Sequence, residues 1–454
     1  MRSSAELTGR VVRPPDSTYS EASAGWNLLF DHKPAVIVFA QNTQDVVNAL
    51  AWARQNDVAP RIRSGRHCLE GWSSVDDGIV IDVSDIKSAT VDVVSNTATV
   101  GAGLNQLEAV ALLGEAGVAA PTGTEGSVGL VGATLGGGFG LLTRVFGMAS
   151  DNLLAAEIVV ASDDGGATAI VASETENSDL LWALRGAGNG NFGIVTSLTY
   201  KVYPLTQTVY ITATWPGLND LPAVFEAWQR SAPHTDNRMT SQLEISPEAV
   251  VLLGVLADGS EGEAKKILAP ILSVGDPEVS MTNKNWADNY AAFQIPIDEE
   301  PANWKFSSQF ISEPLPADGI DVIGSFLACA PTPKCNYMTN AFGGAVAQTP
   351  AGGSAFAHRD ALFYAEPGAG WGTRGDGVRP DADPLTEPCL VWVAEFAEAM
   401  APFVTDAYVN VPNADTPHWE TSYWGAGVEQ LRTIKSKYDP ANVFHYEQSI
   451  PPAT

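Results

Sequence analysis

Glycines crowd one short stretch of the chain, and they limit what that stretch can form. They are Gly123, Gly126, Gly129, Gly132, Gly136, Gly137, Gly138 and Gly140. Glycine weakens helices and strands, so this density is tolerated where the backbone approaches another group closely or takes a positive φ. A flat cofactor pressed against the main chain is such a group, and a glycine-rich surface loop is the alternative.

The spacing of these glycines excludes two common phosphate-binding motifs. No acidic residue ends a following short strand, as the dinucleotide fingerprint requires, and no Gly-Lys-Ser/Thr follows, as a P-loop requires. A second segment, residues 61–73, leaves an expected strand and turns at once through Gly65, with His67 and Gly71 close behind. Such a turn can present successive backbone N–H groups as a nest for a pyrophosphate. An ordinary turn with an exposed histidine is the alternative.

Short β-rich runs alternate with helices from Ala35 onward. Asn42 is the expected N-cap of a helix that buries Val46, Val47 and Leu50. In the first half we expect strands at residues 35–40, 61–63, 78–83, 97–101, 157–161 and 194–202. After Pro204 the pattern predicts strands at 209–215, 241–245 and 250–257 and helices at 221–231 and from Val428 to before Asp439, with loops in the Gly-, Pro- and Asp-rich region 350–388. This order favours an α+β protein whose second part is an antiparallel sheet covered by helices.

Length and composition narrow the class of protein. A chain of 454 residues favours two domains with a cleft between them. The net charge of −28 disfavours nucleic acid and membrane surfaces as partners and suits a neutral or cationic substrate, or serves only solubility. Four cysteines show no zinc spacing, so we expect no metal; a pairing of Cys329 with Cys335 stays open, and nothing in the sequence requires it. We see neither a signal peptide nor a membrane span and expect a cytoplasmic protein; nothing indicates its oligomeric state.

Several segments, in order along nearly the whole chain, resemble the berberine bridge enzyme-like branch of the vanillyl-alcohol oxidase superfamily. The family patterns are Arg-Ser-Gly-Gly-His, then Gly-x-Cys-x-x-Val-Gly with a triple glycine. Further matches are residues 151–152, 181–188, 191–196, 408–410 and 437–444. The resemblance implies a two-lobed protein: a PCMH-type FAD-binding domain from residues 1–205 and 402–454, with an inserted substrate-binding domain at 206–401.

The resemblance also implies FAD bonded through an imidazole nitrogen of His67 to the flavin 8α-methyl group. Many members attach a cysteine to the ring as well, at the position of Glu125. Glutamate cannot form that thioether, so we predict a single covalent link. The remaining residues expected to bind the cofactor are Arg63, Ser64, Gly65, Arg66, Gly71, Gly123, Thr124, Gly126, Ser127, Val128, Gly129, Gly132, Gly136, Gly137, Gly138, Gly140, Asn152, Gly193, Ile194, Val195, Asn410 and Tyr446.

Four further positions each have an expectation of their own. Arg66 replaces the family's second glycine and either contacts a phosphate or carboxylate or lies on the surface. Leu69 replaces a frequent aromatic residue and makes that wall of the substrate pocket more apolar. Cys68 should point away from the flavin if the strand continues. Val128 stands where the family has an oxygen gate, small in oxidases and bulkier in dehydrogenases; a core valine without this role is the alternative.

For catalysis the resemblance requires a base that removes a substrate proton while hydride leaves for flavin N5. Glu366 is the candidate base, and strand alternation places Tyr364 on the same face. Burial among apolar groups would raise the pKa of the Glu366 carboxyl group. The alternative is that Glu366 is an ordinary carboxylate in a loop at the rim of the cavity. Tyr408 is the second catalytic candidate. The alternative is that Tyr408 only packs in the core. His358 and Arg359 are expected to be structural.

We therefore expect an FAD-dependent oxidase that acts on a small organic substrate of secondary metabolism: an alcohol, an amine or a molecule undergoing oxidative cyclisation. Oxygen is the expected acceptor and hydrogen peroxide the by-product. The alternatives are a flavin dehydrogenase with another acceptor and a non-catalytic flavin-binding protein.

Overall fold

The computed structural model describes residues 5–453. Its first sheet contains three short parallel strands. The strand order is β1-β2-β4-β3, with β2, β4 and β3 parallel to one another and β1 antiparallel to β2. The strands are β1 (Arg10–Val12), β2 (Val36–Phe39), β3 (Pro60–Arg63) and β4 (Ile79–Asp82). Every residue of β2 and β4 is buried, which explains why β2 is entirely apolar and why β4 is apolar up to its last residue, Asp82, which pairs with Arg63.

Helix α2 (Thr43–Gln55) follows β2 and begins as the sequence predicts. The side chain of Asn42 accepts a hydrogen bond from the backbone N–H of Asp45, and this cap confirms the expected N-terminus. Val46 and Leu50 are fully buried against the sheet. The turn after β3 carries residues 64–73, so the sheet fixes where this loop starts.

The second sheet is antiparallel, in the order β5-β6-β10-β8-β9. Its strands are β5 (Ala89–Asp92), β6 (Thr97–Gly101), β8 (Leu153–Ala161), β9 (Ala167–Ser173) and β10 (Ile194–Lys201). A small pair joins β7 (Val118–Ala119) to β11 (Tyr203–Pro204). The helices of this half are α1 (Tyr19–Ser23), α3 (Gln106–Glu115), α4 (Leu130–Leu135), α5 (Thr143–Phe146) and α6 (Ser178–Leu184). All strands predicted here are present within a few residues of their expected ends.

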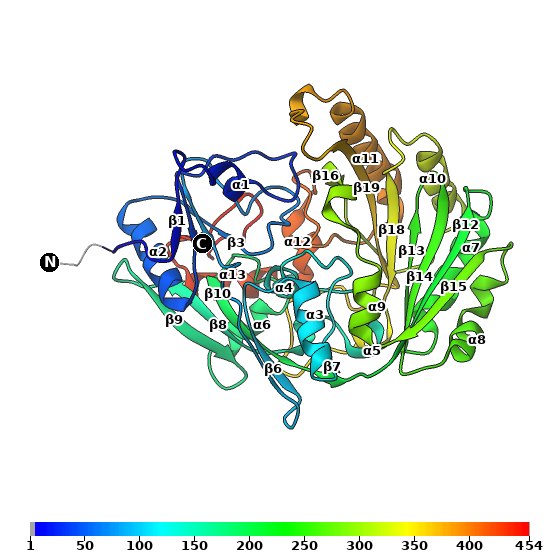
Figure 1. The fold of residues 1–454 in the computed structure, drawn as a ribbon, viewed down its shortest axis with the longest axis horizontal. Coiled ribbons are helices and arrows are strands. Elements are labelled where there is room, and N and C mark those ends of the chain that lie inside the picture. Colours follow the sequence, from blue (N-terminus) through cyan, green and yellow to red (C-terminus); the bar gives the residue numbers. More distant parts are fainter. Residues whose placement is uncertain (1–4, 454) are drawn as a thin grey trace.

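The third sheet is large, antiparallel and covered by helices, as predicted (Figure 1). Its order is β15-β12-β14-β13-β18-β19-β16, and β17 also pairs with β19. The strands are β12 (Thr208–Pro216), β13 (Met239–Ile245), β14 (Ala249–Ala257), β15 (Glu278–Lys284), β16 (Pro301–Phe306), β17 (Gln309–Ile311), β18 (Asn336–Ala341) and β19 (Phe363–Thr373). The helices are α7 (Leu221–Ser231), α8 (Glu261–Leu272), α9 (Trp286–Ala292), α10 (Ala317–Ala328) and α11 (Thr386–Met400).

Strand β19 confirms the strand expected at Tyr364 and Glu366 and extends it further into the region 350–388, where loops were expected. It runs for 11 residues, and the nine from Phe363 to Trp371 are all buried. Glycine is required here by packing: a Cβ on Gly368 would lie 2.6 Å from Asn336 Oδ1 and 2.8 Å from the Phe306 ring. Phe363 and Ala365 pack into the helix-covered core, whereas Tyr364 belongs to an aromatic cluster on the other face. The strand therefore carries Tyr364 and Glu366 on the face turned from the helices.

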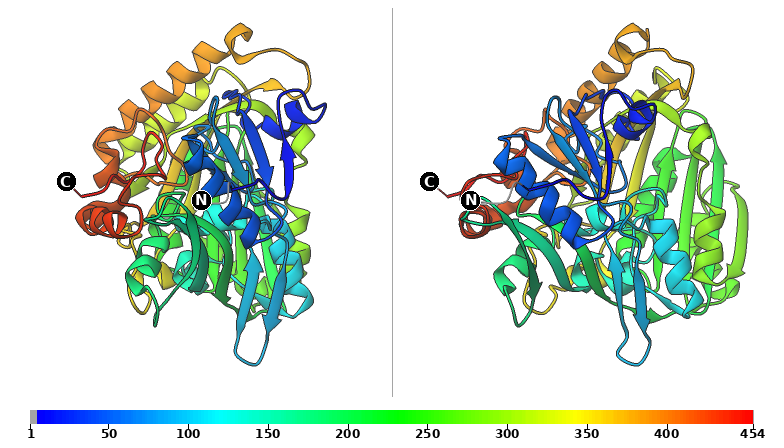
Figure 2. Two further views of the ribbon diagram at one scale, coloured as in Figure 1. Left: turned by 90° about the vertical axis from the view of Figure 1, so that its left-hand side faces the viewer. Right: turned by 60° about the vertical axis from the view of Figure 1, so that its left-hand side comes forward.

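Two large cores lie in the two lobes, and the end of the chain returns to the first. Helices α12 (Trp419–Trp424) and α13 (Val428–Tyr438) contribute Trp424 and Leu431 to the core that also contains β2 and β4. In the right-hand view of Figure 2 the red C-terminal segment lies beside the blue elements of the first lobe. The helix expected from Val428 is confirmed. The domain boundaries at 205 and 401 remain a prediction.

Candidate active site

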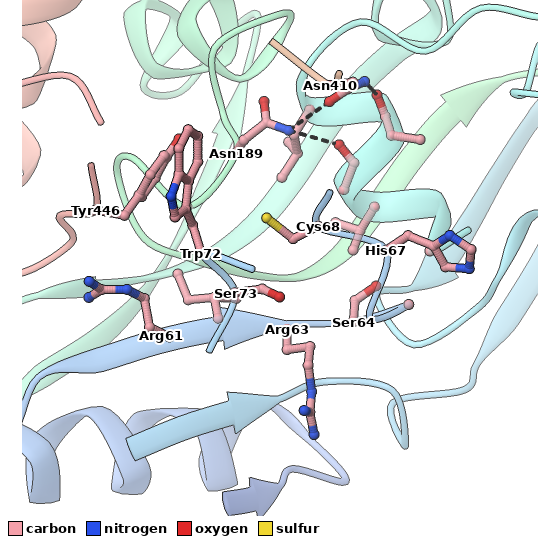
Figure 3. Close-up of a pocket in the computed structure, with 18 of the residues that line it drawn as sticks. Arg61, Arg63, Ser64, His67, Cys68, Trp72, Ser73, Asn189, Asn410 and Tyr446 are labelled. Carbon is pink, nitrogen blue, oxygen red and sulfur yellow. Dashed lines mark hydrogen bonds between the residues drawn. The ribbon is translucent and has the colours of Figure 1, made fainter. Parts of the chain in front are cut away.

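A groove of about 250 Å³ opens where β3 ends. It is lined by the loop after β3, by α4 and the two residues before it, by residues from 189 to 195 and by the C-terminal segment from Phe444 to Gln448. Trp72 and Tyr446 stack at one end, with ring centroids 5.7 Å apart. His67 lies at the opposite end of the view, across Cys68 and Ser64 (Figure 3). Segments far apart in sequence therefore build one elongated groove.

The floor of the groove brings two backbone segments into direct contact. A Cβ on Gly65 would lie 2.1 Å from the backbone nitrogen of Gly129, and a Cβ on Gly129 would lie 2.3 Å from Ser64 Oγ. No side chain fits at either position, so glycine is required at both. A Cβ on Gly132, by contrast, would meet no atom within 4 Å, since this glycine faces the groove.

Polar groups with no protein partner face the same groove. Among residues 5–453, the backbone N–H groups of Gly65, Arg66 and His67 donate to no protein acceptor, and the buried Ser64 Oγ and Arg61 Nε are also unpartnered. Buried donors of this kind normally have acceptors. An anion with several acceptor oxygens satisfies them, so the groove fits a phosphate-bearing cofactor with a flat, partly apolar body.

A second cavity, of about 430 Å³, adjoins the first. It contacts the large sheet through Glu244, Met338 and Trp304, and the first lobe through Trp26. Residues lining both cavities mark where they meet: His67, Leu69, Val128, Ala133 and Asn410. The imidazole of His67 therefore stands at the junction of the two spaces.

His67 is held by an aromatic ring and a hydroxyl group. Its ring stacks on Trp26 with centroids 4.7 Å apart, and its Nε2 lies 2.8 Å from Ser127 Oγ. Desolvation, with a smaller contribution from the charge of Arg374, lowers the pKa of His67 to about 3. The imidazole is thus neutral at physiological pH and keeps a nitrogen lone pair.

Tyr408 anchors a hydrogen-bond network beside the junction. Its hydroxyl oxygen accepts from the backbone N–H of Gly138 and from Asn410 Nδ2, each at 2.8 Å. Asn410 Nδ2 also donates to Ala133 O at 2.7 Å, and Asn189 donates to Asn410 Oδ1 at 2.8 Å (Figure 3). Burial raises the pKa of Tyr408. The phenol is therefore neutral and fixed in orientation.

Glu366 receives a hydrogen bond from the hydroxyl of Tyr364 on β19. Burial raises the pKa of Glu366 to about 7, while this hydrogen bond opposes the rise. Neither residue lines the second cavity, and Glu366 is 8% exposed. Tyr364 packs against two residues that do line it, Phe139 at 4.7 Å and Tyr408 at 5.6 Å between centroids. Tyr364 and Glu366 therefore lie behind the part of the cavity wall that Phe139 and Tyr408 form.

The second cavity combines aromatic walls with carboxylates. Trp26, Trp304 and Phe306 form a stacked series, with successive centroids 6.2 Å and 5.2 Å apart. The acidic residues lining the cavity are Glu125, Glu244, Glu299 and Glu300, against the single lysine Lys334. Desolvation raises the pKa of both Glu244 and Glu300. The lining therefore disfavours an anion.

Comparison with protein-family models matches an FAD-binding domain at residues 34–165 and a berberine and berberine-like domain at residues 407–451. The uncharacterized FAD-linked oxidoreductase YgaK of Bacillus subtilis is 39% identical over 98% of both chains, and YvdP of the same organism is 39% identical over 99% of both. The chain belongs to the berberine bridge enzyme-like FAD-linked oxidoreductases. It is an enzyme that binds FAD and acts on small molecules.

Solved structures agree with this family. The moss protein Physcomitrella patens BBE-like 1 matches with a TM-score of 0.90 at 25% identity, covering 99% of this chain and 98% of its own. Aclacinomycin oxidoreductase matches with a TM-score of 0.87 at 24% identity, over 98% and 99%, which shows the shared fold. Within residues 5–453 of the oxidoreductase, no helix is long and apolar enough to cross a membrane.

Most of the predicted cofactor residues of the oxidoreductase come together. The first cavity is lined by Arg63, Ser64, Gly65, Arg66, His67, Val128, Gly129, Gly132, Gly193, Val195, Asn410 and Tyr446. The second adds Gly123, Thr124 and Gly138, and it is also lined by Tyr408, the second catalytic candidate. Ser127 lines neither cavity, yet it contacts His67. The cavity linings exclude Gly71, Gly126, Gly136, Gly137, Gly140, Asn152 and Ile194.

Two of the residues outside the cavities, Asn152 and Ile194, stabilise the fold. Asn152 donates to the carbonyls of Phe146 and Met148, both at 2.9 Å, and accepts from the Tyr203 hydroxyl. Its side-chain amide therefore stabilises the turn that precedes it. Ile194 is a fully buried core residue of β10. Neither residue lines a cavity, and binding of the cofactor by Asn152 and Ile194 stays a prediction.

Two charged side chains turn from the groove. The guanidinium of Arg63 points away from it in Figure 3, pairing with Asp82 at 2.7 Å and donating to Ala22 O at 2.7 Å. Arg66 has a φ of 63° and donates to Glu21 O at 3.0 Å, with its side chain 31% exposed and Nε 4.0 Å from Asp82. Only the backbone and stems of these arginines therefore reach the groove.

Cys68 corrects another expectation. The strand ends at Arg63, so alternation does not continue to residue 68, and the sulfur of Cys68 points into the groove (Figure 3). Desolvation raises the pKa of this thiol. All four cysteines are free, and the suggested partners differ in burial: Cys329 is exposed and Cys335 buried.

Sequence reasoning missed several lining residues. Trp72 and Arg61 lie inside a segment that the sequence singled out, and Asn189 lies between two matched motifs. Their position inside or next to these motifs is the sequence signal that could have identified them. Trp26 has no such signal, because it reaches His67 only through the tertiary fold.

Proposed function

We propose that this enzyme holds FAD through one covalent bond at His67 and oxidises a small neutral or cationic organic molecule, with molecular oxygen as the acceptor. The observation that carries the proposal is the position of His67. Its neutral imidazole stands where the phosphate-compatible groove meets the second cavity. A ring attached there would have one end in each space.

The lining of the groove is the evidence for how the cofactor is oriented in this proposal. The N–H groups after β3 suit the pyrophosphate, and the Trp72–Tyr446 pair offers an aromatic end for the adenine. Gly65, Gly129 and Gly132 leave the space that a flat group needs. Bound FAD supplies the hydride acceptor, at N5 of its isoalloxazine ring.

In this proposal Glu366 is the general base. Its raised pKa of about 7 suits proton removal near neutral pH, and the Tyr364 hydroxyl orients the carboxylate. Tyr408 positions the substrate and the wall around it, since its phenol is fixed by Gly138 and Asn410. Met338, the strand neighbour of Glu366, and Phe139, which packs on Tyr364, line the cavity in front of this pair, so in this proposal these side chains move aside when Glu366 takes the proton.

The second cavity supports the substrate class. Its stacked tryptophans and Leu69 favour an aromatic or apolar body, and its four glutamates against one lysine favour a neutral or cationic group. An alcohol, an amine or a molecule undergoing oxidative cyclisation meets these requirements, as expected for a secondary metabolite. The pronounced negative charge of the whole chain acts in the same direction.

Val128 supports oxygen as the acceptor. It lines both cavities beside His67, and its small side chain leaves that junction open. A dehydrogenase with another acceptor is the second candidate, and reoxidation of the reduced enzyme with and without oxygen separates the two.

The covalent link is tested by acid precipitation of the purified protein. We expect the yellow colour to stay with the precipitate, ultraviolet fluorescence in a denaturing gel, and one flavin mass on the peptide that contains His67. His67→Ala should release all flavin on precipitation. If the flavin of the wild-type protein passes entirely into the supernatant, the covalent part of the proposal is wrong.

A further inference from the structure

A carboxylate, a hydroxyl and an imidazole form one hydrogen-bonded series at the junction of the two cavities. Ser127 Oγ lies 2.7 Å from Glu125 Oε1 and 2.8 Å from His67 Nε2. Ser127 also donates its backbone N–H to the same Glu125 oxygen at 3.0 Å. Glu125 is the position where many relatives carry the ring-linking cysteine, so this series depends on a departure from the family pattern.

The loop that carries Glu125 is held from two neighbouring elements. Gln106 of α3 donates to Glu125 O at 3.0 Å. Gln294, just after α9, accepts from the backbone N–H of Gly126 at 2.6 Å and donates to Thr124 O at 3.1 Å. These amides fix the loop on both sides of Glu125, so its carboxylate has a defined position toward Ser127.

The proton positions along the series follow from the chemistry of its ends. An ionised carboxylate only accepts hydrogen bonds, so the Ser127 hydroxyl donates to Glu125. Ser127 Oγ then accepts from His67, which places the imidazole proton on Nε2. Among the described residues, no protein donor contacts Nδ1 of His67. The lone pair of His67 is therefore on Nδ1.

We propose that Glu125 and Ser127 are positioning residues for flavin attachment: they hold His67 as the Nε2–H tautomer and accept the Nε2 proton when Nδ1 becomes bonded to the flavin. This inference rests on the proposed covalent link at His67. It assigns the glutamate a role in making the first bond, at the position where relatives use a cysteine for a second.

The attachment balances with oxygen as the oxidant. One C–H bond of the ring's 8α-methyl group and one N–H bond of His67 break, and one C–N bond forms between them. The two electrons and two protons released overall reduce O2 to H2O2. The methyl proton leaves to solvent, and the imidazole proton leaves through Ser127 to Glu125.

Other groups around His67 act differently on its charge. Arg374 lies close enough to disfavour an imidazolium, and Trp26 covers one face of the ring. Glu300 interacts electrostatically with Glu125 and Arg374, and within the described residues it makes no hydrogen bond to His67. Glu125 is thus the carboxylate connected to His67 by hydrogen bonds.

The test measures bond formation separately from FAD binding. Full-length apoprotein, produced under riboflavin limitation, is mixed with FAD in air, and samples are quenched in acid to follow the fraction of flavin in the precipitate. Because general-base assistance contributes about 100-fold or more, we expect E125Q and S127A to slow attachment at least about tenfold. Their Kd for FAD, from flavin fluorescence, should stay within about twofold of wild type.

Two further variants distinguish positioning from simple structural damage. E125D keeps a carboxylate and should recover much of the attachment rate, whereas E115Q, at an exposed glutamate that ends α3, should behave as wild type. Attachment by both E125Q and S127A at the wild-type rate overturns the inference while leaving the covalent link intact. A parallel loss of FAD affinity also overturns it. If E125Q does not fold, S127A decides; a wild-type protein without attached flavin overturns the link and this inference together.

Discussion

The hydroxyl of Tyr364 donates a hydrogen bond to the carboxylate of Glu366, two residues further along β19. Both side chains lie on the strand face opposite the helices because alternate residues of a strand share a face. The phenol therefore holds the carboxylate in one orientation, and burial keeps its pKa high. This pair lies on the large sheet, behind the part of the cavity wall that Phe139 and Tyr408 form.

Replacing Glu366 by glutamine should remove the base while keeping the shape of the site. We expect the rate of flavin reduction by substrate to fall about 100-fold or more, because general-base catalysis contributes 10²–10⁴-fold. Stopped-flow absorbance of the flavin measures this rate. The variant should retain the flavin content of wild type; an unchanged reduction rate would mean that another group takes the proton.

The pH profile should report the same carboxylate. With a pKa of about 7, Glu366 is protonated below that pH and unable to accept a proton. We expect kcat/KM to rise tenfold per pH unit in the acidic range and to level off above about pH 7. The acidic limb should disappear in E366Q. A flat profile from pH 5 to 8 in the wild-type enzyme would contradict this assignment.

Tyr408→Phe removes the acceptor of two buried donors, Gly138 N–H and Asn410 Nδ2. An unsatisfied buried donor costs about 1–3 kcal/mol, so the free energy of unfolding should fall by about that amount. Substrate reduction should slow as well, because the wall beside the substrate loses its anchor. Chemical denaturation and stopped-flow kinetics measure the two effects. Tyr19→Phe, whose hydroxyl contacts Pro34 O far from the site, is the matched control.

Val128→Leu should close the junction that both cavities share. If oxygen arrives by this route, reoxidation of the reduced flavin slows at least about tenfold, or about 1.4 kcal/mol in barrier height. Anaerobic reduction by substrate should change little. Mixing the reduced enzyme with oxygenated buffer gives the rate. Equal reoxidation by wild type and variant would assign Val128 to packing alone.

Lys435→Met should destabilise the lobe that builds the groove. Lys435 Nζ donates to Asp439 at 2.7 Å, to Asn191 O at 2.6 Å and to Phe444 O at 2.5 Å, and both charged side chains are fully buried. Removing the lysine leaves Asp439 unpaired and should cost about 3–5 kcal/mol in unfolding free energy.

The neighbouring Lys437→Met is the control for Lys435→Met. Its partner Asp179 lies at 2.7 Å, but the lysine side chain is 56% exposed. A surface pair of this kind contributes less than about 1 kcal/mol. Thermal unfolding of both variants compares the two losses, and equal losses would show that the buried network is not what holds the C-terminal segment.

Local sequence signals predicted most elements of the fold. The unbroken apolar run in β2, the Asn42 cap of α2 and the amphipathic face of α7 are properties of short segments, and all three are present in the structure. Strand β19 was harder to predict beyond its first residues. Its glycines argue against a strand locally, yet Gly368 and Gly370 are needed because rings of Phe306 and Trp304 on β16 lie against them.

The sequence by itself determined which chemical groups the protein carries and where the backbone has to turn tightly, because these depend on residue type and near neighbours. It indicated His67, Ser127 and Glu366 as separate points of interest. Only the tertiary structure decided that Ser127, 60 residues away, contacts His67 and that Cys68 faces the groove. Such contacts depend on how sheets and loops from distant segments pack together, and no local pattern encodes that distance.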